Sequence, residues 1–109
     1  MNKFKDNLND FFKWVKGTEL VELNDIDVSE DPVRPELTLD FRITHDRKIF
    51  GLKYNNEIEA IVCVVFCPEV PYTLREMDYM SRVKDGTIAV AYTVWSRKRG
   101  AGKEIIKKL

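Results

Sequence analysis

The segment Thr87–Leu109, TIAVAYTVWSRKRGAGKEIIKKL, carries the strongest pattern in this sequence. Its first part, TIAVAYTVW, is rich in β-branched and aromatic residues, which predicts a β-strand. Its last part, KEIIKKL, predicts the beginning of a helix in which Ile105, Ile106 and Leu109 face inward. A basic loop with two glycines joins these parts. The segment therefore predicts a strand, a glycine loop and a helix, in that order.

The glycine loop has the chemistry of an anion site. The first backbone N–H groups of a helix have no partner within the helix, and with the helix dipole they favour a negative charge. Glycine lets the backbone approach a phosphate closely, because it has no Cβ. Basic side chains stand beside the two glycines at Arg97, Lys98, Arg99 and Lys103. We therefore expect a phosphate or pyrophosphate to bind here.

The spacing of the glycines narrows the kind of phosphate site. The nucleotide P-loop, G-x-x-x-x-G-K-[ST], fails because Glu104 follows Gly102 and its lysine. The dinucleotide motif G-x-G-x-x-G fails because position 105 is isoleucine. The pattern that fits is R-x-x-G-x-G, formed by Arg97, Gly100 and Gly102.

This pattern, after a strand and at the start of a helix, resembles the acyl-coenzyme-A loop of the GNAT N-acetyltransferase superfamily. The resemblance covers roughly Lys48–Leu109, and TVWSRKRGAGKEII is also similar to GNAT homologues carried by tailed bacteriophages. It implies that Arg47–Tyr54, Ile58–Cys67 and Thr87–Trp95 are central antiparallel strands and that the cofactor helix starts at Gly100. Either TELVEL or LTLDFRI would supply the family's first strand.

The resemblance also implies a ligand and a set of contacts. Acetyl-CoA would be the cofactor, and an amine of unknown identity would accept the acetyl group by direct attack on the thioester. Loop amides would hold the pyrophosphate, the strand edge Tyr92–Trp95 would pair with the pantetheine arm, and a backbone amide near Val94 would polarise the thioester carbonyl. The implied cofactor-binding residues are Val94, Trp95, Arg97, Lys98, Arg99, Gly100, Ala101, Gly102 and Lys103. No catalytic residue is assigned, because the spacing selects none of the candidate bases Glu57, Glu59, Glu69 and Glu76.

The chain departs from the family pattern at its end, because it stops at Leu109 within the cofactor helix. We therefore expect residues 1–109 to form one GNAT-like domain that is incomplete at its C-terminus and silent in catalysis by itself. The alternative function is non-enzymatic: a phage structural or virion-associated protein that uses the fold as an interaction module, with a protein partner at the exposed sheet edge. A third reading is a small module for phosphorylated or nucleic-acid ligands, whose binding would depend steeply on salt.

The rest of the chain predicts further elements of an α+β domain with a mostly antiparallel sheet. Apolar residues at helical spacing from Phe4 to Val15 predict a first helix that stops at Gly17. The acidic stretch Gly17–Asp40 reads as a solvated connector, in which TELVEL is either an edge strand or irregular. Alternating apolar residues predict a strand over Leu37–Ile43.

The middle of the chain predicts a hairpin and a short helix. RKIFGLKY and IEAIVCVVFC read as two strands joined by a tight turn at Asn55-Asn56. The second of these strands is apolar on both faces, which indicates a central strand covered on both sides. A short helix is expected across TLREMDYMSRV, residues 73–83, with Thr73 as its N-cap and Glu76 three residues later.

Composition excludes several classes of protein. With 18 basic and 18 acidic residues among 109, the chain lacks the basic excess of a general nucleic-acid coat. No apolar run is long enough for a membrane helix and no signal peptide begins the sequence, so we expect a cytoplasmic or virion-internal location. Cys63 and Cys67 would lie too far apart on one strand for a disulfide, and His45 is the single histidine, so no zinc site is expected.

Overall fold

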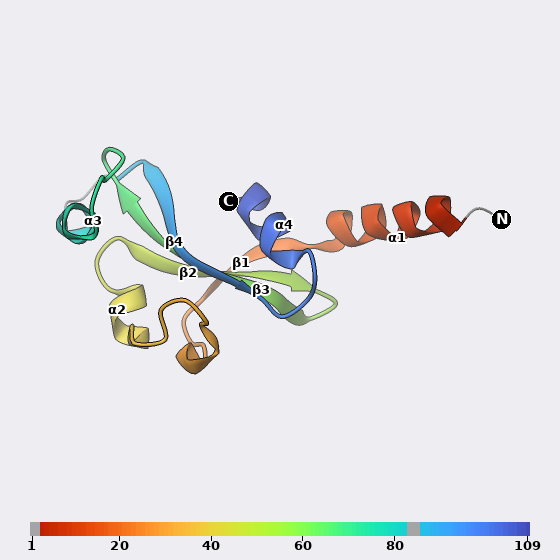
Figure 1. Cartoon of the computed structure of the whole chain (residues 1–109), viewed down its shortest axis with the longest axis horizontal. Coiled ribbons are helices and arrows are strands. Elements are labelled where there is room, and N and C mark those ends of the chain that lie inside the picture. The colour runs from red at the N-terminus through yellow and green to blue at the C-terminus, as the bar shows by residue number, and fades with distance from the viewer. Residues whose placement is uncertain (1–2, 83–85) are drawn as a thin grey trace.

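The computed structural model describes residues 3–82 and 86–109 and shows an α+β fold (Figure 1). The described elements, in chain order, are α1 Lys3–Gly17, β1 Glu19–Leu23, the 3₁₀ turn η1 Val28–Glu30, α2 Leu39–Ile43, β2 Arg47–Tyr54, β3 Glu57–Cys67, α3 Leu74–Ser81, β4 Ile88–Ser96 and α4 Ala101–Lys108. The four strands form one antiparallel sheet in the order β1-β2-β3-β4.

The strands confirm most of the sequence prediction. Of the two alternatives for TELVEL, the structure shows the edge strand: the segment contains β1, which pairs antiparallel with β2. Asn55 and Asn56 join β2 to β3 with positive φ angles of 49° and 64°, as a tight hairpin turn between right-twisted strands requires. Because each strand pairs with the next one in sequence, β4 lies at one edge of the sheet.

The strand β3 is the centre of the hydrophobic core, as predicted. Every side chain from Ala60 to Val65 is fully buried. Figure 1 shows α4 on one face of the sheet, and α2 with the segment before it on the other face. Ala101 and Ile105 of α4 pack on Leu52 and Val62, which covers the first face. The two-sided apolar pattern of β3 thus follows from cover on both faces.

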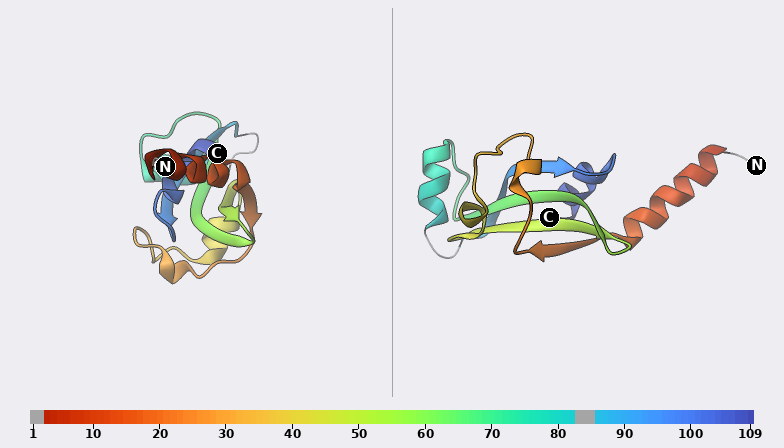
Figure 2. Two further views of the ribbon diagram at one scale, coloured as in Figure 1. Left: turned by 90° about the vertical axis from the view of Figure 1, so that its right-hand side faces the viewer. Right: turned by 90° about the horizontal axis from the view of Figure 1, so that it is seen from below.

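The helix α1 is confirmed, but its apolar face is largely exposed. Figure 2 shows α1 projecting from one end of the sheet, with α3 at the opposite end. Phe11 is 48% exposed and Phe12 is 51% exposed, whereas Trp14 is half-buried against the core. The predicted contribution of the Phe4 side chain lies outside the described side chains. Gly17 is the last residue of α1, as expected.

The predicted strand over Leu37–Ile43 is wrong, because Leu39–Ile43 forms the short helix α2. Thr38 caps this helix, since its Oγ1 accepts a hydrogen bond of 3.1 Å from the amide of Phe41. The alternation treated Arg42 as a polar residue on an exposed strand face. Arg42 is instead fully buried, and its Nε donates to the carbonyl of Leu37 at 3.1 Å.

The acidic connector also departs from a solvated loop, because Asp31 is only 1% exposed. Its carboxylate pairs with Nη1 of Arg42 at 2.8 Å and accepts hydrogen bonds from the Thr93 hydroxyl on β4. Burial by itself raises the pKa of Asp31, but hydrogen bonds from the Arg34 and Val33 amides and from Arg42 and Thr93 outweigh it. The pKa of Asp31 is therefore lower than usual. This pair fastens the connector to the sheet.

The predictions for α3 are confirmed, whereas those for α4 are confirmed only in part. α3 is confirmed, with Thr73 Oγ1 accepting from the Glu76 amide at 3.1 Å; residue 83 of the predicted helix lies outside the described residues. In α4, Ile105 is fully buried as predicted. The inward direction predicted for Ile106 and Leu109 is wrong, since they are 45% and 41% exposed. In α4 only one side of the helix meets the sheet.

Both cysteines on β3 are free thiols, as their spacing on one strand predicts, and both are fully buried. Burial raises the pKa of Cys63 and of Cys67 above the ordinary thiol value. His45 is exposed and lies in a turn, with a φ of 56°. Within residues 3–82 and 86–109, no helix combines the length and the apolar character needed to cross a membrane.

Candidate functional site

The glycine loop connects β4 to α4 and is held in place by its own backbone. The carbonyl of Glu59 on β3 accepts hydrogen bonds from the amides of Arg97 (2.7 Å) and Lys98 (3.2 Å). The chain then turns through Gly100, which caps α4 with a φ of 86°. This left-handed conformation favours glycine. The loop is therefore anchored on the sheet and delivers the first turn of α4.

The first amides of α4 have the predicted shortage of partners. The amide of Ala101 donates to the Lys98 carbonyl at 3.1 Å. Among the described residues, no protein acceptor is recorded for four neighbouring amides: those of Arg99, Gly100, Gly102 and Lys103. A Cβ built on Gly100 would meet no atom within 4 Å. Open space therefore lies beside unpaired donors at a helix N-terminus, which is the arrangement that binds phosphate oxygens.

The second glycine serves a different purpose from the first. Gly102 lies inside the first turn of α4, and the structure records a positive φ for Gly100 but not for Gly102. A Cβ on Gly102 would come within 2.6 Å of Oγ of Ser96. Gly102 therefore allows close packing of α4 on the end of β4, and only Gly100 needs the glycine conformation.

The four basic side chains of the loop do not gather at one point. Arg97 turns to the connector and binds Oε2 of Glu30 through Nε (3.0 Å) and Nη2 (2.7 Å). Lys98 pairs with Oε2 of Glu59 at 3.2 Å. In the described part of the chain, Arg99 and Lys103 have no carboxylate within ion-pair distance. Half of the predicted cationic cluster is thus committed to internal pairs.

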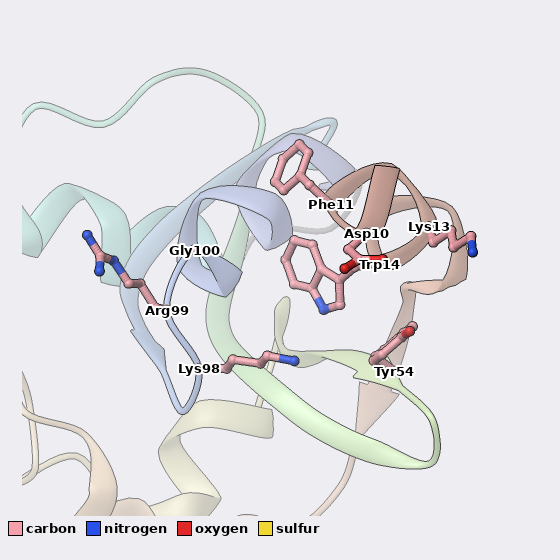
Figure 3. Close-up of a pocket in the computed structure, with 8 residues that line it drawn as sticks. All are labelled: Asp10, Phe11, Lys13, Trp14, Tyr54, Lys98, Arg99 and Gly100. Carbon is pink, nitrogen blue, oxygen red and sulfur yellow. The ribbon is translucent and has the colours of Figure 1, made fainter. Parts of the chain in front are cut away.

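A pocket of about 460 Å³ opens beside the loop, between α1, β2 and Gly100 (Figure 3). Lys98 points between Trp14 and Tyr54, whereas Arg99 points away from them. Nε1 of Trp14 donates to Oε1 of Glu59 at 2.6 Å. The Lys98 ammonium also lies 5.7 Å from the centre of the Tyr54 ring, within range of a cation–π contact.

Sequence reasoning did not connect Trp14, Tyr54 and Glu59 with the loop. Trp14 and Tyr54 are distant from the glycines in sequence, and Glu59 was considered only as a general base. Glu59 is 6% exposed, and its carboxylate already accepts a hydrogen bond from Trp14 and pairs with Lys98. It therefore positions the loop. Glu76 accepts from the Tyr72 amide at 2.8 Å. The other two candidate bases, Glu57 and Glu69, are exposed.

The strand residues that the resemblance implies for cofactor binding, Val94 and Trp95, lie on β4. Their side chains pack inside the protein, so only their backbone groups could contact a ligand. The Trp95 side chain is 6% exposed and belongs to the core, and Val94 packs against the face that α4 covers. β4 carries a bulge: Cys63 pairs with Thr93 and Val64 with Ala91, which leaves Tyr92 without a partner on β3. In the described chain no strand pairs with the outer edge of β4.

Comparison with known proteins gives a similarity at the level of the fold. No protein-family model matches this sequence, and no curated protein matches it. A solved structure, malonyl-CoA decarboxylase from Cupriavidus metallidurans, is similar with a TM-score of 0.57 and 20% sequence identity. The similarity covers 94% of this chain but only 30% of that chain. At this identity it shows a shared fold, and this chain spans less than a third of the decarboxylase.

Proposed function

We propose that this chain binds a CoA thioester as the cofactor-binding part of an acetyltransferase-like protein, with acetyl-CoA as the ligand. The observation that carries the proposal is the N-terminus of α4, where the amides of Arg99, Gly100, Gly102 and Lys103 have no acceptor within the described chain. The space beside Gly100 leaves them accessible. A pyrophosphate supplies several anionic oxygens that such a row of amides can bind.

Two further observations support a CoA-type ligand. Arg99 and Lys103 stand beside these amides without a carboxylate partner in the described residues, so their charge is available to phosphate. The similar solved structure is a malonyl-CoA decarboxylase, and malonyl-CoA is itself a CoA thioester. The resemblance of the loop to the GNAT superfamily, stated from the sequence, points to the same ligand.

The residues of this chain would position the CoA thioester, and none of them is assigned as a base that activates the acceptor amine. The outer edge of β4, with which no strand of the described chain pairs, would offer backbone groups near Val94 to the pantetheine amides and to the thioester carbonyl. When bound, acetyl-CoA supplies an activated acetyl group. In such a transfer the amine nitrogen would form a bond to the acetyl carbon, the carbon–sulfur bond would break, and the CoA thiolate would take up the proton that the nitrogen loses. Since no strand of the described chain pairs with the outer edge of β4, we expect residues 1–109 alone to bind the ligand without turnover.

The test is calorimetric titration of CoA into the whole chain and into variants of the loop. Gly100→Val places a branched side chain in the open space at a left-handed φ, so binding should be lost. Lys103→Gln should weaken binding about fivefold, the effect of roughly 1 kcal/mol from one exposed charge contact. Lys107→Gln removes the same charge one turn further along α4 and is the matched control. Equal CoA affinity in the wild type, Gly100→Val and Lys103→Gln would refute the site.

The alternative function is a non-enzymatic interaction module, as a phage structural or virion-associated protein would use. The observation that favours it is the exposed apolar face of α1, where Leu8, Phe11 and Phe12 are 40–51% exposed. Monomeric soluble proteins rarely expose large contiguous apolar patches, and where such a patch occurs it often marks a surface that binds another molecule. A folded chain that showed no affinity for CoA would favour this alternative over the acetyltransferase-like function.

A further inference from the structure

A second site lies on the face of the sheet opposite α4, and we call it the β4 groove. Its deepest part is a cavity of about 130 Å³, lined by Arg34, Leu37, Phe41, Leu74, Met77, Asp78 and Tyr92. It continues into a more open space of about 340 Å³ along Val90–Tyr92, which shares Arg34, Leu74, Met77 and Tyr92 with the cavity. The groove therefore runs from an apolar cavity to the bulged edge of β4.

The cavity has the size and lining of a receptacle for one apolar side chain. A cavity of about 150 Å³ lined by aliphatic and aromatic groups admits a benzene ring. The walls of this cavity are mostly apolar. Two of them are rings in edge-to-face contact, since Phe41 and Tyr92 have centroids 6.3 Å apart at 84°. A leucine-sized or phenyl group fits such a space.

Arg34 gives the groove a preorganised cation. Its backbone is fixed at both ends, because its amide donates to Asp31 at 3.0 Å and its carbonyl accepts from Arg42 at 2.7 Å. Its Nε donates to the Tyr92 carbonyl at 3.3 Å, at the bulge. Within the described chain, no carboxylate lies within ion-pair distance of the Arg34 guanidinium. The terminal nitrogens of that fork are thus left for an external carboxylate.

The charges around the groove also favour an anionic ligand group over a cationic one. Among the described residues that line the cavity, Asp78 is the sole carboxylate. Both of its oxygens are already engaged, one by Arg47 and the other by Arg82 at 3.6 Å. A ligand amine would therefore find no free carboxylate in the cavity, whereas a ligand carboxylate would find Arg34.

We infer that the β4 groove binds a free α-amino acid with a large aliphatic or aromatic side chain. The side chain fills the cavity, the carboxylate binds Arg34, and the α-amine is left on the open side along Ala91 and Tyr92. That side is the edge of β4 to which the proposed function assigns the thioester. The amino acid's role as acetyl acceptor therefore rests on the proposed function, but its binding to the groove does not.

The test is titration of the whole chain, without CoA, with L-leucine, L-phenylalanine, L-leucinamide and glycine, followed by calorimetry. Leucine and phenylalanine should bind. Leucinamide has the same side chain without the carboxylate and should bind at least about tenfold more weakly, because charge-assisted hydrogen bonds are lost. Glycine, which has no side chain for the cavity, should show no binding.

Two variants separate the parts of the groove. Arg34→Gln keeps the backbone bonds to Asp31 and Arg42 and should make leucine and leucinamide bind equally. Met77→Trp fills the cavity and should abolish the binding of both. Arg75→Gln, which removes an exposed charge of α3 outside the groove lining, is the control and should change neither affinity. Circular dichroism of each variant confirms that it is folded.

The outcomes distinguish this inference from the proposed function. Equal affinity for leucine and leucinamide in the wild type, or no binding of either, overturns the amino-acid site whatever CoA does. Binding of leucine with the expected variant pattern, in a chain that shows no affinity for CoA, supports the site and overturns its acceptor role.

Discussion

Arg42 is the side chain that fixes the connector between β1 and β2 onto the sheet. It is fully buried, pairs with Asp31, donates to the backbone of Arg34 and Leu37, and lies 3.4 Å from the Cys63 sulfur. A buried charge of this kind is stable because it is paired and hydrogen-bonded, and each of the three guanidinium nitrogens of Arg42 donates to an acceptor. The same contacts hold Arg34 at the β4 groove, so one residue links the core to the second site.

Removing the guanidinium should therefore be strongly destabilising. Arg42→Leu leaves the Asp31 carboxylate buried without its counter-ion, and we expect the free energy of unfolding to fall by about 3–5 kcal/mol. Urea denaturation followed by circular dichroism measures it. Arg97→Gln, which breaks the half-exposed pair with Glu30, is the control and should cost about 1 kcal/mol or less. Equal small losses in both variants would mean that the buried pair contributes little.

The lowered pKa of Asp31 makes a prediction about acid. A carboxyl whose pKa is lower in the folded state than in the unfolded state binds fewer protons when folded. Its contribution is therefore complete above the ordinary aspartate pKa of about 3.9 and is lost as the pH falls through the lower folded value. The stability of the wild type should decline over this acidic range. Asp31→Asn should be less stable at pH 7 and should show a shallower decline. Parallel curves for the two proteins would contradict the assignment.

At the scale of elements, the strands can be predicted from the local residue pattern. The wrong prediction, at α2, concerns a segment whose contacts come from residues elsewhere in the chain. β2, β3 and β4 are predictable because β-branched and apolar residues alternate or run continuously, and the Asn55-Asn56 turn joins two of them. α2 is not predictable in this way: its alternation resembles a strand, whereas the structure buries Arg42 in an ion pair with Asp31 from another segment.

The candidate site likewise has features that the sequence predicts and features that it does not predict. Gly100 and the unpaired amides follow from the glycine spacing before a helix, which a sequence displays directly. The pairing of Arg97 with Glu30, and of Glu59 with Trp14 and Lys98, joins segments that lie far apart in the chain. No local pattern reports such contacts, so sequence reasoning placed all four loop cations at one point.

The burial of β3 makes a prediction about its two thiols. Cys63 and Cys67 are fully buried and their pKa values are raised, so each has little access to a reagent and little reactive thiolate. We expect both to remain unmodified by a disulfide reagent in the native protein and to react at once in denaturant. Mass spectrometry after a short exposure counts the labels. Rapid labelling of both thiols under native conditions would contradict a central position for β3.

At the scale of the whole molecule, both candidate sites lie along the same edge strand, β4. The amides of α4 follow the end of β4, and the β4 groove follows its bulged middle on the opposite face. In the described chain the outer edge of β4 pairs with no strand and connects the two places. A ligand that ran along this edge from the loop would bring its far end to the groove, which is the arrangement that transfer between two ligands requires.

The most direct test of the central claim, a CoA phosphate site at the start of α4, is an amide-resolved NMR titration of the whole chain with CoA. We predict saturable shifts of the amide resonances of Arg99, Gly100, Gly102 and Lys103, with smaller shifts along Val94 and Trp95 at the edge of β4. The amides of Arg97 and Lys98, already bound to the Glu59 carbonyl, should move less. Shifts confined to α1 or α3, or none at saturating CoA, would contradict the account.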